Sequence, residues 1–235
     1  MSYIEVRGNI FNSKAEALVN TVNCVGVMGK GIALEFRRRF PDMFKLYAED
    51  CKNGKLKPGH VYYYRHGERL ILNFAIKGHW KYPSRIEWIE SCLRQFVQEY
   101  SQKNIHSVAF PWMGAANGGL PLDLIKATTR KHLKDLNDIE VEIYEFAPNV
   151  SDPLFEVLRR IADSHDATMF ANVSGLQKRA CQKIIESIQD GQINSLANLA
   201  NLVNSGIGEK STDKLYLFLS QYDQANKPPT QPSLF

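Results

Sequence analysis

Short apolar segments alternate with amphipathic segments along the first part of the chain. Residues 6–10 and 17–22 flank a polar turn, and they predict two strands or a strand and a short helix. Further strands are predicted at residues 60–64, 69–75, 107–111 and 141–146, and helices at residues 31–39, 43–52, 84–103 and 121–136. This alternation predicts an α/β domain of three layers with a mixed central sheet, whose ligand sites lie at the carboxyl ends of the strands.

The pattern changes after residues 147–153, APNVSDP, which have the composition of a domain boundary. Helical patterns follow at residues 154–164, 175–189, 193–204 and 209–222. The sequence therefore predicts a first domain over residues 1–147 and an all-α C-terminal region over residues 154–222. The Pro-rich end, residues 223–235, is expected to be a disordered tail.

Two glycine-rich loops carry the clearest chemical signal. The glycine-rich part of residues 19–36, VNTVNCVGVMGKGIALEF, and residues 113–120, MGAANGGL, each follow a predicted strand and lead into a predicted helix. Glycine allows the backbone to approach a ligand closely, and the start of a helix offers unpaired N–H groups that attract anions. The two loops together predict a cradle for a diphosphate, although a glycine-rich turn can also serve tight packing alone.

The usual nucleotide-binding signatures do not fit these loops. Residues 206–211, GIGEKS, contain Glu209 where a P-loop needs lysine after its glycine, and they follow no predicted strand. The spacing in residues 26–31, GVMGKG, does not match the dinucleotide fingerprint, and no acidic residue ends a strand about twenty residues later. The sequence thus argues against a P-loop triphosphate and a nicotinamide cofactor.

Composition narrows the class of protein. The 235 residues are 44% hydrophobic and 23% charged, which is ordinary globular composition. The four cysteines lack paired spacing, so neither a disulfide framework nor a metal site is predicted. No signal-peptide pattern and no long apolar run is present, so we expect a cytoplasmic protein with no membrane partner. The net charge of +4 suits an anionic ligand or nucleic acid, but it also serves solubility alone.

Five segments together resemble one known family. RGNIF, ALVNTVNCVGVMGKGIALEFRRRFPDMF, LNFAIKGHW, SRIEWIESCL and AFPWMGAANGGLPLDLI are similar, in this order, to the macrodomain family. Within that family they resemble the branch of DNA ADP-ribosyl glycohydrolase antitoxins. The similarity covers about residues 1–147, and it implies the macrodomain fold, ADP-ribose binding, and hydrolysis that removes ADP-ribose from a nucleobase, with thymine in DNA as the expected base and no cofactor.

The resemblance also implies which residues bind ADP-ribose. The two loops would hold the diphosphate and the distal ribose, Asn23 would hydrogen-bond that ribose, and Asn9 with the Ile10 backbone would meet the adenine edge. Phe146 or Tyr144 would stack on the adenine, although each also fits a core position. The ADP-ribose contacts expected in this way are Asn9, Ile10, Asn23, Met28, Gly29, Lys30, Gly31, Ile32, Gly114, Ala115, Ala116, Asn117, Gly118, Gly119, Leu120 and Phe146, with Tyr144 as the alternative to Phe146.

Lys77 is the expected catalytic residue. A lysine at a strand end is commonly a solvated charge, but the matching lysine of this branch is implicated in the cleavage. Desolvation would favour its neutral amine, which could attack C1″ of the distal ribose or assist opening of that sugar. Gly118 stands where other hydrolases of the branch have Asp, which favours a nucleobase link over a carboxylate ester. The proton donor is unassigned; His79 is a candidate, and it also fits a packing role.

A DNA carrier, a protein carrier and a pure binding function remain alternatives. Trp80 and Tyr82, with Lys81 and Arg85, could meet phosphates and an unstacked base, or the tryptophans could belong to the core. The rival functions are a non-enzymatic ADP-ribose reader and a hydrolase of protein esters or of an ADP-ribose phosphate. A cognate ADP-ribosyltransferase toxin is an open partner, because the C-terminal region does not resemble that of the antitoxins. The sequence leaves three functions open for that region: a packing module, a contact with DNA or a surface that binds the toxin.

Overall fold

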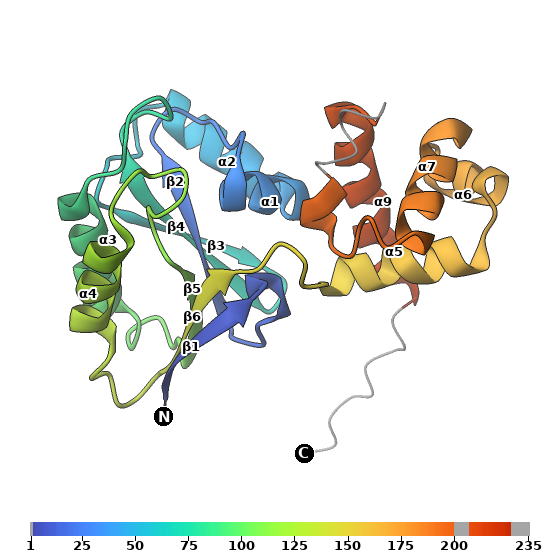
Figure 1. Cartoon of the computed structure of the whole chain (residues 1–235). Helices are drawn as coiled ribbons and strands as arrows, with labels where there is room; N and C mark the ends of the chain where they lie inside the picture. Colours follow the sequence, from blue (N-terminus) through green and yellow to red (C-terminus); the bar gives the residue numbers. More distant parts are fainter. Residues whose placement is uncertain (1, 200–206, 227–235) are drawn as a thin grey trace, which may run out of the picture. The chain divides into compact units, whose positions relative to one another are not determined.

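The chain divides after Ala147 into two compact units (Figure 1). A computed structural model describes residues 2–199 and 207–226. Each unit has its own hydrophobic core of fully buried side chains. None of the helices within the described residues is long and apolar enough to cross a membrane.

The described part of the first unit contains one six-stranded sheet, in the order β1-β6-β5-β2-β4-β3. All neighbouring strands pair in parallel except β3 and β4, which form an antiparallel hairpin. The mixed sheet predicted from the sequence is therefore confirmed. The strands are β1 (Tyr3–Gly8), β2 (Ala17–Asn23), β3 (Val61–His66), β4 (Arg69–Lys77), β5 (Ser107–Pro111) and β6 (Glu140–Phe146).

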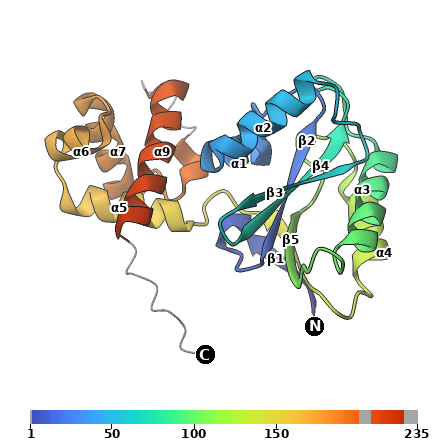
Figure 2. The ribbon, with the colours of Figure 1, turned by 180° about the vertical axis from the view of Figure 1, so that it is seen from behind.

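Helices cover both faces of this sheet. Figures 1 and 2 show α1 (Gly31–Arg39) and α2 (Pro41–Lys52) on one side, and α3 (Ile86–Glu99) and α4 (Leu122–Leu133) on the other. Successive side chains of β4 alternate between two cores: Leu72 and Phe74 pack in the core that includes α3 and α4, whereas Ile71 packs in the core that includes α1 and α2. This period-two burial produces the three layers that the sequence predicts.

The first strand begins earlier than its apolar run. β1 covers Tyr3–Gly8 rather than residues 6–10, because its residues pair in register with β6 along the whole segment. Glu5 lies in this strand and accepts hydrogen bonds from Arg130 of α4 at 2.7 and 2.8 Å. A prediction based on apolar runs leaves out this charged residue and therefore starts the strand too late. Ile10 instead begins a short 3-10 helix, η1 (Ile10–Asn12).

The second unit is helical in its described residues. It contains α5 (Pro153–Ser164), α6 (Ala167–Ser174), α7 (Lys178–Gln189), the 3-10 helix η2 (Leu196–Leu199) and α9 (Glu209–Asn226). Phe170 of α6, Cys181 of α7 and Tyr216 of α9 are fully buried in one core. The predicted all-α appendage is confirmed.

One helix of this unit was not predicted, and two boundaries differ. Asp166 caps α6 by accepting hydrogen bonds from the N–H groups of Thr168 and Met169, both at 2.8 Å, and Gly175 ends that helix in the left-handed region at φ 63°. Gly175 therefore precedes the next helix instead of starting it. Of the expected helix at 193–204, only η2 is seen, and residues 200–204 lie outside the described residues. The expected tail is wrong for residues 223–226, which are helical, and residues 227–235 lie outside the described residues.

Candidate functional site

The carboxyl ends of five parallel strands place the predicted site residues along one edge of the sheet. In spatial order, β1 leads to Asn9, β6 ends at Phe146, β5 leads into the second glycine loop, β2 leads into the first, and β4 ends at Lys77. Strands that run in parallel bring their carboxyl ends to the same edge, so segments far apart in sequence meet there. The topology thus gathers the residues that the sequence singles out.

Asn23 organises the first glycine loop. Its side-chain oxygen accepts hydrogen bonds from the N–H of Val25 at 3.0 Å and from the hydroxyl of Tyr47 at 3.2 Å, and its amide nitrogen donates to the Val27 oxygen. Tyr47 also donates to the backbone oxygen of Asn23 at 2.8 Å. Asn23 and Tyr47 are both buried. The contact between Asn23 and the ribose stays a prediction, because in the structure this side chain holds its own loop.

Tyr47 is a residue of the site that sequence reasoning missed. It lies on α2, and its hydroxyl fastens the root of a loop that begins at Asn23. Burial raises the pKa of Tyr47 above its ordinary value, so the hydroxyl keeps its proton and acts as a donor. In the sequence Tyr47 is simply an apolar position of an amphipathic helix, and no local pattern links it to Asn23.

The first loop ends at the start of α1. Lys30 is the N-cap residue of this helix, and its side chain makes no capping hydrogen bond. Gly31 has φ 57°, in the left-handed region that favours glycine. Met28, by contrast, is fully buried in the core, so only its backbone can contribute to a ligand site. The loop therefore presents backbone and a helix N-terminus, the elements that bind anions in proteins.

The second loop folds back upon itself. Leu120 donates its N–H to the Gly114 oxygen at 3.1 Å, and Ser84 donates its N–H to the Gly118 oxygen at 2.9 Å. A Cβ atom on Gly118 would lie under 3.0 Å from three backbone atoms of Gly114, a separation that real Cβ atoms essentially never show. Glycine is therefore required at position 118 in this conformation, and the side chain of an Asp has no room there.

The two loops and Lys77 meet at Asn117. A Cβ atom on Gly31 would lie 2.5 Å from the Asn117 side-chain nitrogen, so the start of α1 lies directly against the second loop. Lys77 Nζ donates to the Asn117 backbone oxygen at 2.5 Å. Across the sheet, Lys77 is also the register partner of Asn23, just after a shift in register at which β4 has one residue more than β2. The structure thus brings together both loops and the predicted catalytic lysine.

The environment of the Lys77 amine makes its charged form less favourable than that of a solvated lysine. Partial burial lowers the pKa of Lys77, and desolvation is the single cause of this shift. Its hydrogen-bond partner is a backbone carbonyl, which accepts from an amine as well as from an ammonium group. The neutral amine is therefore more accessible on Lys77 than on a solvated lysine, and its catalytic role stays a prediction.

The adenine end of the predicted site has an exposed aromatic ring, Phe146. Phe146 is 60% exposed and is the register partner of Gly8, directly before Asn9. Tyr144 is only 8% exposed and lies in the core, with its ring 3.8 Å from the position of a Cβ on Gly8, and the stacking of its ring on adenine stays a prediction. Asn9 caps η1 by accepting from the N–H of Phe11 at 3.1 Å, and its contact with adenine stays a prediction.

A turn with three aromatic rings follows Lys77. The His79 and Trp80 rings stack with centroids 5.4 Å apart, and Tyr82 lies 5.7 Å from His79. His79 Nδ1 accepts the N–H of Lys81 at 3.1 Å, so in the neutral ring the proton is on Nε2. His79 thus has a free N–H edge two residues from Lys77, and its role as proton donor stays a prediction.

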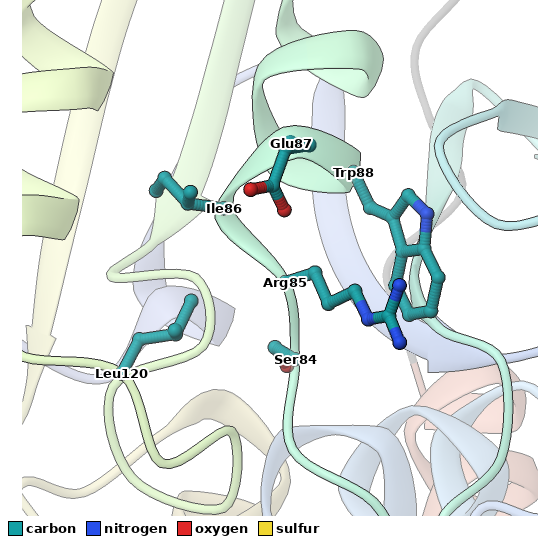
Figure 3. Close-up of a pocket in the computed structure, with 6 residues that line it drawn as sticks. All are labelled: Ser84, Arg85, Ile86, Glu87, Trp88 and Leu120. Carbon is teal, nitrogen blue, oxygen red and sulfur yellow. The ribbon is translucent and has the colours of Figure 1, made fainter.

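A shallow pocket of about 480 Å³ adjoins the second loop at the start of α3 (Figure 3). Figure 3 shows the Arg85 guanidinium beside the Trp88 ring, 4.9 Å from its centroid. Leu120 is the one lining residue that belongs to the predicted ADP-ribose contacts. In the described part of the chain, no group of three or more His, Cys, Asp and Glu side chains is arranged to hold a metal ion. The pocket is lined by Ser84, Arg85, Ile86, Glu87, Trp88 and Leu120.

These features define a macrodomain. Residues 19–129 match the family described as Macro domain, and the chain belongs to this family. It is 43% identical over 148 residues to the DNA ADP-ribosyl glycohydrolase of Thermus aquaticus, which covers 61% of this chain and 41% of that protein. The corresponding protein of Mycobacterium tuberculosis is 40% identical over 141 residues, covering 58% and 40%. The match therefore spans about two fifths of the length of these curated relatives.

Solved structures of macrodomains are similar to this chain as well. The macrodomain of Mycobacterium tuberculosis DarG has a TM-score of 0.59 and 39% identity, over 60% of this chain and 96% of that one. A structure of Thermosipho africanus DarTG in complex with ADP-ribose has a TM-score of 0.59 and 34% identity, over 62% of this chain and 42% of that one. The likeness covers about the length of the first unit.

Proposed function

We propose that the first unit is a DNA ADP-ribosyl glycohydrolase, which hydrolyses the bond between ADP-ribose and a nucleobase, with thymine in DNA as the substrate base. Relatives with that name are 40–43% identical to the chain. Water is the second substrate, and the products are free ADP-ribose and the unmodified base.

The order of groups along the sheet edge carries this proposal. From β1 to β4 the edge crosses four strand spacings, or about 19 Å. Along it follow an exposed aromatic ring, two anion-binding loops and an amine, the order that adenine, diphosphate and distal ribose require. Phe146 would stack on adenine, Gly31 and the second loop would bind the diphosphate, and Lys77 would reach the distal ribose.

Lys77 supplies the reactive group in this arrangement. Its neutral amine attacks C1″ of the distal ribose, so that a bond from Nζ to C1″ forms as the bond from C1″ to the base breaks. The base leaves with its electron pair and takes a proton, for which His79 Nε2 is the nearest candidate in the chain order. Water then attacks C1″, which releases ADP-ribose and returns the amine.

The absence of a side chain at Gly118 bears on the substrate. Related hydrolases of the branch carry Asp at this position, whereas the fold-back of the second loop onto Gly114 leaves no room for one here. The second loop therefore supplies no carboxylate at position 118, and the proton that the leaving base needs must come from another group.

The direct test compares three substrates with two variants. Purified chain is incubated with an ADP-ribosylated DNA oligonucleotide, an ADP-ribosylated protein ester and ADP-ribose 1″-phosphate, while calorimetry measures binding of free ADP-ribose. We expect turnover of the DNA, a loss of about 100-fold or more in Lys77→Ala, and ADP-ribose affinity within a few-fold of wild type. Lys45→Ala, at an exposed position on α2, is the matched control.

Three outcomes would redirect the assignment. Wild-type turnover in Lys77→Ala excludes the lysine mechanism, and binding without turnover by the wild type indicates a reader. Preference for the phosphate substrate would favour a phosphatase. That arm is included because the ADP-ribose 1″-phosphate phosphatase of Meyerozyma guilliermondii is 38% identical over 56 residues, covering 23% of this chain and 32% of that protein.

We also propose that the biological partner is an enzyme that attaches ADP-ribose to DNA. A Thermosipho africanus protein named DNA ADP-ribosyl transferase-DNA ADP-ribosyl glycohydrolase fusion protein is 35% identical over 158 residues, covering 59% of this chain and 40% of that protein. The fusion places the two named activities in one chain. Co-expression of that transferase with this chain should reduce ADP-ribose on cellular DNA, and Lys77→Ala should not.

A further inference from the structure

The turn between β4 and α3 exposes more aromatic surface than packing requires. Trp80 is 50% exposed and Tyr82 is 68% exposed, and both side chains lie near His79. Large aromatic side chains normally contribute to cores, and an exposed cluster of them marks a binding surface. We call the rings of His79, Trp80 and Tyr82 the aromatic platform.

We propose that the aromatic platform stacks on unpaired bases of the DNA strand that carries the modified nucleotide, so that the protein recognises the strand as well as the ADP-ribose. This inference rests on the proposed function and adds a second substrate-binding surface to it. Stacking on aromatic rings is the general way in which proteins bind single strands without reading their sequence.

The platform is fixed beside the predicted catalytic site at both of its ends. At one end Lys77 donates to the Asn117 oxygen, and at the other Ser84 donates its N–H to the Gly118 oxygen at 2.9 Å. Within the turn, Tyr82 donates its N–H to the His79 oxygen at 3.2 Å. A strand whose modified base lies at the Lys77 amine therefore passes this turn within one or two nucleotides.

The charge of the segment fits a nucleic acid backbone. Residues 77–85 include Lys77, Lys81 and Arg85 and no acidic residue. Lys81 Nζ lies over the Trp80 ring, 5.3 Å from its centroid, which places a cation at the ring that would stack. The first carboxylate beyond the segment is Glu87, in the first turn of α3. A basic groove lined with aromatic rings is the arrangement that binds single-stranded nucleic acid.

The internal geometry also prepares Trp80 for stacking. Its ring stacks on His79 with an interplanar angle of 28°, and the His79 ring is itself held by the hydrogen bond from the Lys81 N–H. A ring that is supported on one face loses little side-chain freedom when a base covers the other face. Trp88, in contrast, is half-buried at the start of α3.

The test compares a modified oligonucleotide with a modified nucleoside. The full chain and its variants hydrolyse an ADP-ribosylated 12-nucleotide single strand and ADP-ribosyl-thymidine, and the ratio of the two kcat/KM values is measured. We expect wild type to prefer the oligonucleotide, and Trp80→Ala or Tyr82→Ala to lower the ratio about 10-fold. Trp80→Phe keeps a ring and should restore most of the preference. Leu46→Ala, which removes an exposed side chain of α2, should leave the ratio unchanged.

A second measurement separates this inference from the proposed function. Fluorescence anisotropy of an unmodified single-stranded oligonucleotide reports strand binding even if the chain hydrolyses neither substrate. Trp80→Ala should weaken this binding about 10-fold, and Lys81→Ala should lower the slope of log affinity against log salt by about 0.7. The inference is overturned if wild type shows no preference for the strand, if both alanine variants keep the wild-type ratio, or if a duplex or an RNA of the same sequence binds better than the single-stranded DNA.

Discussion

Gly118→Ala tests whether the fold-back of the second loop is essential for ligand binding. The added Cβ would lie under 3.0 Å from the O, Cα and C atoms of Gly114, well short of the 3.4 Å at which ordinary contacts begin. All three atoms belong to the backbone, so no rotamer change can relieve the overlap. The loop must open.

The cost follows from the hydrogen bonds that close the loop. Opening strains the bond from the Leu120 N–H to the Gly114 oxygen and the bond from the Ser84 N–H to the Gly118 oxygen. At about 1 kcal/mol each, their loss amounts to about 2 kcal/mol. If ADP-ribose binds only to the closed loop, its affinity falls about 30-fold. Global unfolding changes less, because loops can open without the core.

Calorimetry with ADP-ribose measures the affinity, and thermal unfolding measures the effect on the fold. The matched control is Gly67→Ala in the hairpin turn, where φ is also left-handed at 58° but no atom lies within 4 Å of the added Cβ. In Gly67→Ala the left-handed backbone should cost about 1 kcal/mol of folding stability, and the affinity for ADP-ribose should stay that of the wild type. If Gly118→Ala binds ADP-ribose within two-fold of wild type, the closed loop is not the binding conformation and the argument fails.

Three further predictions test other parts of the site. Desolvation lowers the pKa of Lys77, and in the proposed mechanism the neutral amine attacks, so kcat/KM should rise tenfold per pH unit below that pKa and level off above it. A flat pH profile would contradict this mechanism. Lys77→Arg, whose side chain stays charged, should be inactive. Tyr47→Phe removes the donor to Asn23 and should lower the Tm of the first unit by about 3–6 °C in calorimetry; an unchanged Tm would show that the hydroxyl does not hold the loop. Phe146→Ala should weaken ADP-ribose binding about 5–10-fold, whereas Tyr144→Phe should leave the affinity unchanged, and equal effects would place adenine elsewhere.

The sequence predicted the placement of the candidate residues where local chemistry and topology agree. Glycine-rich segments after apolar runs predicted two anion-binding loops, and the parallel order β5-β2-β4 does bring both of them to one edge of the sheet. Lys77 ends β4 at that same edge. These features could be read from the chain because each depends on a few neighbouring residues and on the general rule for parallel strands.

The features that were missed depend on contacts between distant segments. Nothing near Asn23 in the sequence indicates that Tyr47 holds it, because the two residues meet only when α2 packs against the sheet. The burial of Tyr144 depends on its central position in β6, between β1 and β5. The α6 helix was missed because its signals, the Asp166 cap and Gly175, frame only eight residues.

The fold-back at Gly118 also bears on the proposed reactivity of Lys77. A carboxylate next to a lysine stabilises the ammonium form and raises the pKa of that lysine. The glycine loop instead presents the backbone oxygen of Asn117 to Lys77 Nζ, and the pKa of Lys77 is lowered by desolvation with no opposing charge. The residue that excludes an acidic side chain from the second loop therefore also keeps the amine closer to its neutral, nucleophilic form.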